Sequence, residues 1–226
     1  LQAKIDQLKM SIADDLNAML WADGSGNGGK DMFGLVALVG DDTANGASAT
    51  DVHVGGIAAA TYTFWRSVVQ DGPMDLSDFS GIDLLNSVYN SIRINRSKVD
   101  VEFTTQANFE AYEALAVPNI RFQNLRAADL GFETIAHKTA EVIFEPDVPD
   151  SGDSSDGAHT FAGGGGWFLL NSDRLEFVQH ADSWITPTEF VRPYNQDAKT
   201  MLVLSMGNLI TDSRRSHGVI FNTTVP

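Results

Sequence analysis

A glycine-rich segment near the start of the chain has the spacing of a phosphate-binding loop. Residues 24–30 fit the pattern GxxxxGK, and the glycines at 24, 26 and 29 fit GxGxxG. Such loops follow a strand and precede a helix, so that backbone N–H groups and the helix N-terminus face the phosphates. Here a predicted helix precedes the glycines, and Asp31 follows Lys30 where a Ser or Thr would bind magnesium. We therefore expect no nucleotide site, and a nucleotide-binding enzyme stays a less favoured alternative.

The candidate metal ligands are loop aspartates and dispersed histidines. The aspartates recur at intervals of three, whereas an EF-hand uses alternate residues and a terminal Glu, so we expect a solvated acidic loop. They are Asp147, Asp150, Asp153 and Asp156. The histidines form no HExxH pair, which disfavours zinc. They are His53, His137, His159, His180 and His217. The sequence thus predicts no metal, no cofactor and no catalytic residue.

Three shorter motifs have ordinary explanations. Residues 95–97 and 222–224 match the glycan acceptor pattern, but no secretion signal is visible, so we expect no glycans there. The pair Arg214 and Arg215 suits an acidic partner or a phosphate, although a solvated turn is the more ordinary interpretation. No GxSxG nucleophile elbow occurs.

The charge balance argues against a phosphate-binding surface over the whole molecule. The 226 residues include 15 basic and 30 acidic side chains, a net charge of -15. Most of the acids are Asp and Arg outnumbers Lys, which keeps a protein hydrated when salt screens charges. We take this as an indication of a salt-loving host, with an ordinary acidic protein as the alternative. The chain has no cysteine and no apolar run long enough to cross a membrane.

Three helices are predicted to position the candidate residues described above. The first covers residues 1–20 and has one apolar stripe; its members are Ile5, Leu8, Ile12, Leu16 and Met19. The second is capped by Ser80, with Asp83 three residues on; its apolar face holds Ile82, Leu85, Tyr89 and Ile92. The third begins near Thr104 and ends at Pro118.

Strands alternate with these helices, which indicates an α+β or α/β protein. The segment 99–103 alternates Val and Phe with Asp100 and Glu102, the period of a half-buried strand. Other predicted strands are 140–146, 167–171 and 174–180, and residues 34–40 form a short buried run. The end of the chain is predicted to be a hairpin with Arg214 and Arg215 at its tip. The loop at 145–166 should be exposed and mobile. The predicted core anchors are Trp21, Trp65, Trp167 and Trp184.

Several segments between about residues 80 and 221 resemble, in the same order along the chain, segments of one group of tailed-phage major capsid proteins. In that group a strand ending in a Thr-Thr-Gln-like turn precedes a helix with a Tyr-Glu pair, as residues 104–106 and 112–113 do here. An Ala-Asp-x-Gly-Phe segment at 128–132 precedes a strand and an Asp-Pro-like turn, matched loosely at 145–146. The series ends with an Asn-Gln-Asp turn at 195–197, followed by Gly-Asn-Leu, Ser-Arg-Arg and Gly-Val.

The resemblance implies the Johnson fold, an α+β architecture with a long spine helix, a peripheral domain and an axial domain. It places the spine helix and part of the peripheral domain at 1–65. The axial domain follows at 66–200, and strands at 201–226 return toward the peripheral domain. The N-terminal arm and extended β-hairpin loop of the family would lie upstream of this chain or be absent from it.

The function implied by the resemblance is structural and not enzymatic. Subunits would self-assemble as hexamers and pentamers of an icosahedral shell, in the virion of a tailed virus, around double-stranded DNA that is bound without sequence specificity. Decoration, scaffolding and portal proteins would be further partners, and the long acidic loop at 146–166 would be a lineage-specific feature or a contact for decoration. The alternative is an encapsulin-like compartment shell, which has the same fold as a viral capsid protein and differs from it only in cargo.

Overall fold

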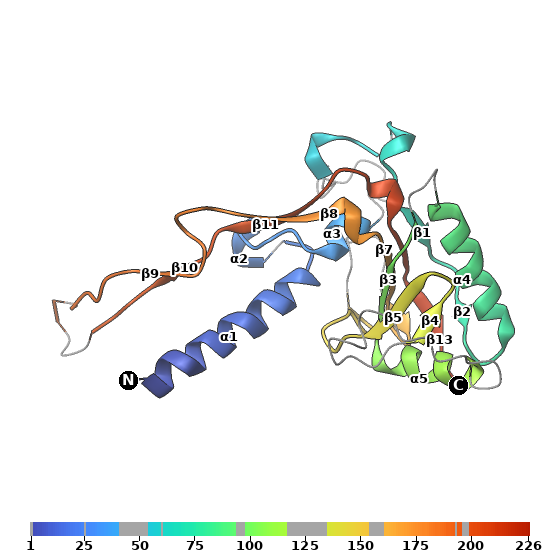
Figure 1. Cartoon of the computed structure of the whole chain (residues 1–226), viewed down its shortest axis with the longest axis horizontal. Helices are drawn as coiled ribbons and strands as arrows, with labels where there is room; N and C mark the ends of the chain where they lie inside the picture. The colour runs from blue at the N-terminus through green and yellow to red at the C-terminus, as the bar shows by residue number, and fades with distance from the viewer. Residues whose placement is uncertain are drawn as a thin grey trace.

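The computed structural model describes most of the chain as a body and a projecting arm (Figure 1). The described residues are 2–24, 26–40, 54–59, 61–93, 98–116, 135–153, 161–192, 194–195 and 199–226. The helices are α1 (Gln2–Leu20), α2 (Gly26–Gly29), α3 (Leu35–Val39), α4 (Phe79–Ile92) and α5 (Gln106–Ala116), with the 3-10 turns η1 (Val54–Gly56), η2 (Thr63–Trp65), η3 (Ser172–Arg174) and η4 (Arg214–Ser216). None of the helices described is long and apolar enough to span a membrane.

A six-stranded mixed sheet organises the body, in the order β1-β12-β7-β3-β5-β4. At its centre β3 runs antiparallel to β7, with Phe103 opposite Phe168, and parallel to β5. The strands are β1 (Val68–Gln70), β3 (Val101–Thr104), β4 (Ile135–His137), β5 (Ala140–Phe144), β7 (Trp167–Leu170) and β12 (Gly218–Ile220). Segments far apart in the sequence therefore pack as one unit.

Both faces of this sheet are covered. Trp167 and Leu169 of β7 belong to a core that includes residues of α4 and α5. Phe168 and Leu170 belong to a second core, which includes Trp21 and residues of α3. Because successive side chains of a strand alternate between faces, a strand covered on both sides is apolar throughout. This explains the unbroken apolar run of β7.

The three predicted helices are present, but the predicted cap of the second is wrong. Asp78 caps α4, and its side chain accepts a hydrogen bond from the Ser80 N–H (2.7 Å). Hydrogen bonds from the Ser80 side chain and backbone lower the pKa of the Asp78 carboxyl. Asp and Ser are both favoured caps, and the backbone decides between them, since Asp78 is extended while Ser80 is already helical. Pro118 lies outside the described residues.

The apolar faces of the helices pack to different extents. On α4, Leu85, Tyr89 and Ile92 are buried as predicted, and Ile82 is half-buried. The stripe of α1 is less covered: Leu8 is exposed, and its other described members, Ile12, Leu16 and Met19, are half-buried. The long first helix therefore keeps an incompletely covered apolar face.

The predicted strands are found, but in the first only Val99 is buried as predicted, and the alternation does not hold from Val101 on. Glu102, expected on the exposed side, is 0% exposed, whereas Val101 and Phe103 are half-buried. The alternation in the sequence is typical of a sheet with one solvent-exposed face, whereas here helices and loops cover both faces. A buried carboxylate then needs polar partners inside the protein.

The predicted terminal hairpin is also wrong. β11 (Gly207–Thr211) pairs with the earlier strand β8 (Leu175–Gln179), while β12 pairs with β1 and β7 of the central sheet. The segment with Arg214 and Arg215 is η4, which links the arm to the body. The last strand, β13 (Asn222–Thr224), lies between β2 (Met74–Asp75) and β6 (Ala162–Gly163) in a three-stranded sheet.

The loop at 145–166 is predicted to be exposed, but both of its ends are packed. Val148 and Phe161 are buried in the second core. A Cβ on Gly165 would lie 2.8 Å from the Pro149 carbonyl oxygen, so two segments of the loop approach closely only because a glycine stands there. Residues 154–160 lie outside the described part.

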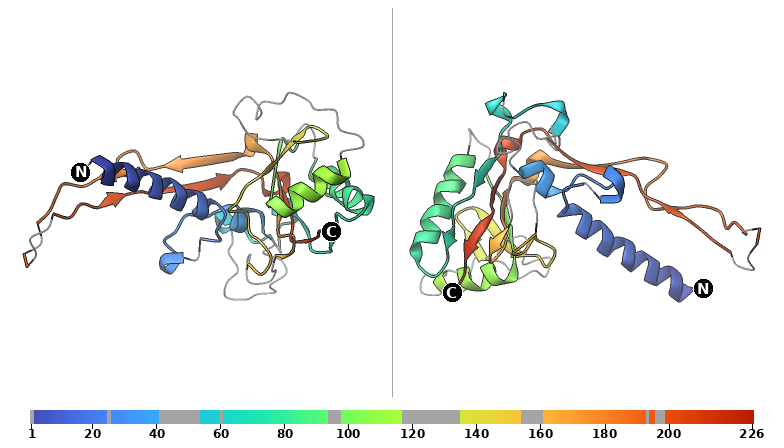
Figure 2. Two further views of the ribbon diagram at one scale, coloured as in Figure 1. Left: turned by 90° about the horizontal axis from the view of Figure 1, so that it is seen from below. Right: turned by 180° about the vertical axis from the view of Figure 1, so that it is seen from behind.

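The arm is a two-stranded ribbon built from two sheets in series. β8 pairs with β11 next to the body, and β9 (Thr186–Pro187) pairs with β10 (Val203–Leu204) farther out. A bridge between Val191 and Thr200 continues the ribbon toward its tip. Both views of Figure 2 show the ribbon and α1 leaving the body on the same side.

Candidate assembly surfaces

The glycine-rich segment does not have the geometry of a phosphate loop. The helix α1 precedes it, and residues 26–29 form an irregular turn in which Asn27 and Gly28 have left-handed backbones. The next helix, α3, has only five residues and begins at Leu35. The Asp31 carboxylate lies so close to Gly26 that a Cβ there would overlap it. The turn therefore places a negative charge where a phosphate would have to bind.

The loop acids that the structure describes are engaged within the chain. Asn17 of α1 donates hydrogen bonds to Glu145 Oε1 (2.9 Å) and Asp147 Oδ2 (2.5 Å), and Asp153 accepts one from the Asp150 N–H. Among the described residues, no three His, Asp or Glu side chains are grouped as metal ligands. Predicted positions outside the described part are His53, 95–97, 128–132, Asp156, His159 and 196–197.

A buried polar cluster joins the sheet to α4. Glu102 Oε1 lies 2.7 Å from His137 Nδ1, and Glu102 Oε2 accepts a hydrogen bond from Trp167 Nε1 (2.9 Å). His137 Nε2 lies 3.3 Å from Asn86 Oδ1 on α4. The pKa of Tyr112, which lies beside the cluster, is raised to about 12, mainly by burial and to a smaller extent by the charge of Glu102. Since Glu102, His137 and Trp167 are all buried, the cluster satisfies polar groups of the core and does not face a substrate.

His217 is buried as a neutral side chain. Its Nδ1 accepts a hydrogen bond from the Asn171 N–H (3.3 Å), so the proton is on Nε2, which lies 3.1 Å from Thr211 Oγ1. Burial lowers the pKa of His217 to about 4; the carboxylates of Asp212 and Asp100 act in the opposite direction. The side chain ties the arm strand β11 to the body.

The paired arginines are not a basic tip. Arg214 is 1% exposed, and its guanidinium donates hydrogen bonds to the carbonyl oxygens of Leu38 (2.8 Å) and Gly40 (2.6 Å) at the end of α3. Arg215 is exposed. Arg214 thus binds the C-terminal end of a short helix of the same chain, where cations are favoured.

The tryptophans predicted as core anchors divide into two classes. Trp21 and Trp167 are buried, which confirms the prediction for them. Trp65 and Trp184 are only half-buried. Trp184 packs edge-on against Phe177 of β8, with ring centroids 5.0 Å apart, and so belongs to the arm.

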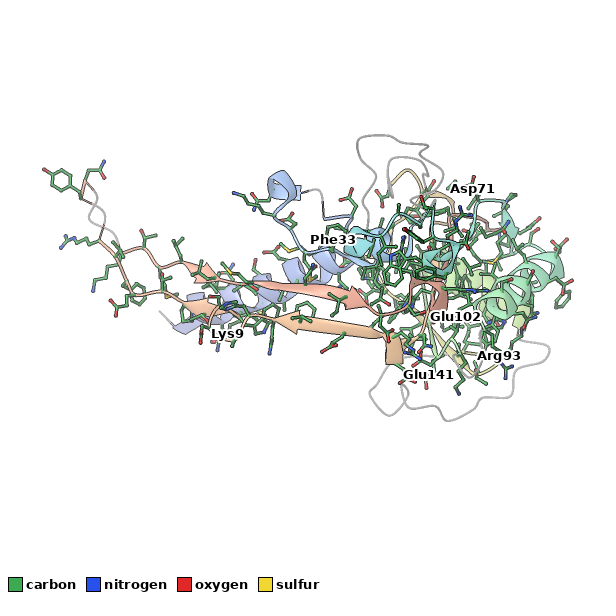
Figure 3. All side chains as sticks on the ribbon, turned by 90° about the horizontal axis from the view of Figure 1, so that it is seen from above. Lys9, Phe33, Asp71, Arg93, Glu102 and Glu141 are labelled. Atoms are coloured by element: carbon green, nitrogen blue, oxygen red, sulfur yellow. The ribbon has the colours of Figure 1, made fainter. Side chains whose placement is uncertain are left out.

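The arm carries most of the exposed large apolar side chains of the described residues. Seen from above, side chains project on both sides of the ribbon, whereas Glu102 lies among the dense side chains of the body (Figure 3). Tyr194, near the tip, is fully exposed at 106% of its reference area. The exposed set is Phe177, Val178, Ile185, Phe190, Val191, Tyr194, Leu202, Leu204, Met206 and Ile210, which we call the arm surface. Exposed large apolar side chains gathered on one element are typical of binding surfaces.

Two hollows lie along the arm. One, of about 490 Å³, separates α1 from the ribbon; its apolar lining includes Ile12, Leu16, Met19, Met32, Trp184, Val203 and Met206. The other, of about 440 Å³, lies between α3, η1, η2 and β11 near Trp65 and Ile210. The first hollow also has polar lining residues, among them Asp15, Lys30, Asp31 and Ser205, whereas the second is lined mainly by apolar side chains.

Comparisons with known proteins identify the architecture. No family model matches the sequence, and no curated protein matches it. A chain of the holo-SrpI encapsulin complex from Synechococcus elongatus PCC 7942 is similar with a TM-score of 0.60 and 12% identity, over 98% of this chain and 66% of that one. A chain of the cyanophage A-1(L) capsid asymmetric unit is similar with a TM-score of 0.53 and 19% identity, over 96% and 70%. The chain has the Johnson fold of capsid shells.

The Johnson fold confirms the predicted α+β class. This chain spans about two thirds of the length of each of these two chains. Sequence reasoning missed the arm surface, although apolar residues recur through 177–210, because isolated apolar residues among polar ones also fit a half-buried strand. It also missed the buried roles of Glu102 and Arg214, for which the local sequence gives no signal.

Proposed function

We propose that this chain is the subunit of a closed shell, in which copies assemble as hexamers and pentamers around the double-stranded DNA of a tailed virus. The observation that carries the proposal is the arm surface on a capsid-shell fold. A two-stranded ribbon is at best marginally stable alone in water, and it becomes stable when another surface covers its apolar side chains. In a homo-oligomer, that surface belongs to a second copy.

The charge of the subunit fits this role. A net charge of -15 disfavours tight binding to packaged DNA, so the shell would enclose it without gripping it. Decoration, scaffolding and portal proteins stay predicted partners. The division at 1–65, 66–200 and 201–226 also stays a prediction, as does the salt-loving host.

The second candidate is an encapsulin-like shell that holds protein cargo. It is favoured by the coverage of the encapsulin-complex chain, which aligns with 98% of this chain at the higher TM-score. The two candidates share the assembly step and differ in what the particle contains. Particles isolated from the source would contain nuclease-protected DNA in the first case and a protein cargo in the second.

Assembly is tested with variants of the arm surface. Val191→Lys with Leu202→Lys places charges on two exposed apolar positions of the outer ribbon, and we expect particles to be lost while the subunit stays folded. Glu113→Lys, exposed on α5 of the body, is the matched control and should assemble normally. Electron microscopy and size-exclusion chromatography give the readout. A parent protein that stays monomeric at every salt concentration would refute the proposal.

A further inference from the structure

The turn after α1 contains an asparagine that is followed directly by a glycine. Asn27 and Gly28 belong to α2, and all four residues of this turn are exposed. Asn27 has a φ of 49° and Gly28 a φ of 70°, both in the left-handed region. No other asparagine that the structure describes stands before a glycine, and the second such pair of the sequence, 45–46, lies outside the described residues. The pair matters because its two residues can react with each other.

The glycine removes the main steric barrier to a reaction between the backbone and the asparagine side chain, because it has no Cβ. In that reaction the Gly28 backbone nitrogen bonds to Asn27 Cγ, the bond from Cγ to the side-chain nitrogen breaks, and ammonia leaves with the proton of the Gly28 N–H. The product is a succinimide ring. Water then opens the ring at either carbonyl and leaves aspartate or isoaspartate. The sum consumes an amide and a water molecule, releases ammonia, and needs no oxidant or cofactor.

The structure of the turn leaves this attack unhindered. Beyond the adjacent residues, a Cβ on Gly28 or on Gly29 would meet no atom within 4 Å, so no packed neighbour resists the rotation that carries the Gly28 nitrogen to Asn27 Cγ. Among the described residues, none forms a hydrogen bond or ion pair with the Asn27 side chain. Exposed segments with few contacts open at low free energy. We therefore expect the folded chain to react at Asn27 at a rate close to that of the unfolded chain.

Asn17, earlier on α1, has the opposite arrangement. Its side chain donates hydrogen bonds to Glu145 Oε1 (2.9 Å) and Asp147 Oδ2 (2.5 Å), and the next residue is Ala18. Its backbone is fixed within a helix of 19 residues. These restraints keep the Ala18 nitrogen away from Asn17 Cγ. Trypsin, which cleaves after Lys and Arg, releases both asparagines on one peptide, residues 10–30, so Asn17 is an internal control.

We propose that Asn27 is a site of spontaneous modification, at which the folded protein converts asparagine to aspartate and isoaspartate through a succinimide formed with Gly28. Asn27 lines the hollow between α1 and the ribbon, together with Asp15, Lys30 and Asp31. Each conversion adds a negative charge to that hollow, in a chain whose net charge is already -15. The modification goes beyond the proposed function and does not depend on it. Its accumulation in an ageing shell would rest on the proposed function.

The test follows both asparagines in the folded full chain. The protein is incubated in mildly alkaline buffer and digested with trypsin, and the two products on peptide 10–30 are separated by chromatography and identified by mass spectrometry. We expect Asn27 to convert at least about tenfold faster than Asn17, with aspartate and isoaspartate both present. A second sample in guanidinium chloride gives the unfolded rate, and the folded rate should be at least about one third of it. A smaller ratio in either comparison, or aspartate without isoaspartate, overturns the proposal.

The role of Gly28 is tested by adding a methyl group. Gly28→Ala should lower the rate of conversion by about tenfold or more, because the Cβ hinders the attack. Gly29→Ala is the matched control: this glycine has a φ of 78° and equally open surroundings, but its nitrogen does not react, so the rate should stay within about twofold. Equal falls in both variants would overturn the assignment to Gly28. If Gly28→Ala does not fold, Asn27→Gln, whose longer side chain would have to form a larger ring, should remove the modification, and conversion that persists at this position would refute the mechanism.

Discussion

At the scale of single residues, the two adjacent arginines of η4 differ in burial and in their partners. Arg214 is buried and donates to the carbonyls of Leu38 and Gly40, whereas Arg215 faces solvent. We expect Arg214→Ala to lower the free energy of unfolding by about 2–4 kcal/mol, because the carbonyl groups of Leu38 and Gly40 lose the buried donors that the guanidinium supplies, and among the described residues Gly40 keeps only the Ser67 hydroxyl. Arg215→Ala, the matched control, should change it by less than about 0.5 kcal/mol. Urea denaturation measures both, and equal losses would contradict the assignment.

His217 makes stability depend on pH in a predictable direction. Its pKa is about 4 in the folded state and 6.5 in the unfolded chain, so below pH 6.5 the unfolded state takes up the proton first. The contribution of the neutral histidine is therefore complete above pH 6.5 and is lost as the pH falls toward 4, to a total of about 3 kcal/mol. His217→Gln, which cannot titrate, should be less stable at neutral pH and should lose less on acidification. Parallel pH curves for parent and variant would exclude this role.

At the scale of elements, the cap of α4 separates a sequence prediction from the observed geometry. The motif predicts Ser80 as the cap, whereas the Asp78 side chain accepts the hydrogen bond from the Ser80 N–H. We expect Asp78→Ala to lower the Tm by about 2–4 °C, since a helix N-terminal donor loses its partner. Ser80→Ala keeps that backbone donor and should have a smaller effect. Thermal unfolding followed by circular dichroism distinguishes the two, and the reverse order would favour the sequence prediction.

At the scale of the whole molecule, the net charge of -15 opposes both compactness and association. Added salt screens this repulsion, so raising sodium chloride from about 0.05 M to about 1 M should increase the Tm by on the order of 5 °C and promote particle formation. A variant with Asp14→Asn, Glu113→Gln and Glu176→Gln, all exposed, should show a weaker salt dependence. A Tm that is independent of salt in both proteins would show that charge repulsion is unimportant here, and would remove one argument for a salt-loving host.

The sequence by itself determined the elements whose signals are local. The helix at 2–20 and the packed face of α4 follow from apolar residues at helical spacing, and β7 follows from an apolar run. The ordered family motifs determined the fold class. The helices and the strand need only the chain within a few residues, which is why pattern and propensity suffice for them, whereas the fold class needed motifs in order along most of the chain.

Only the tertiary structure decided which surfaces meet. Glu102 is buried because helices and loops cover both faces of its sheet, and Arg214 is buried because α3, about 175 residues away, presents its carbonyl oxygens there. The predicted hairpin failed for the same reason, since β11 pairs with β8 and β12 with β7 across long separations. Strand partners and the depth of a side chain depend on contacts between distant segments, and a local pattern carries no information about them. The arm surface, on which the proposed assembly rests, belongs to this second class.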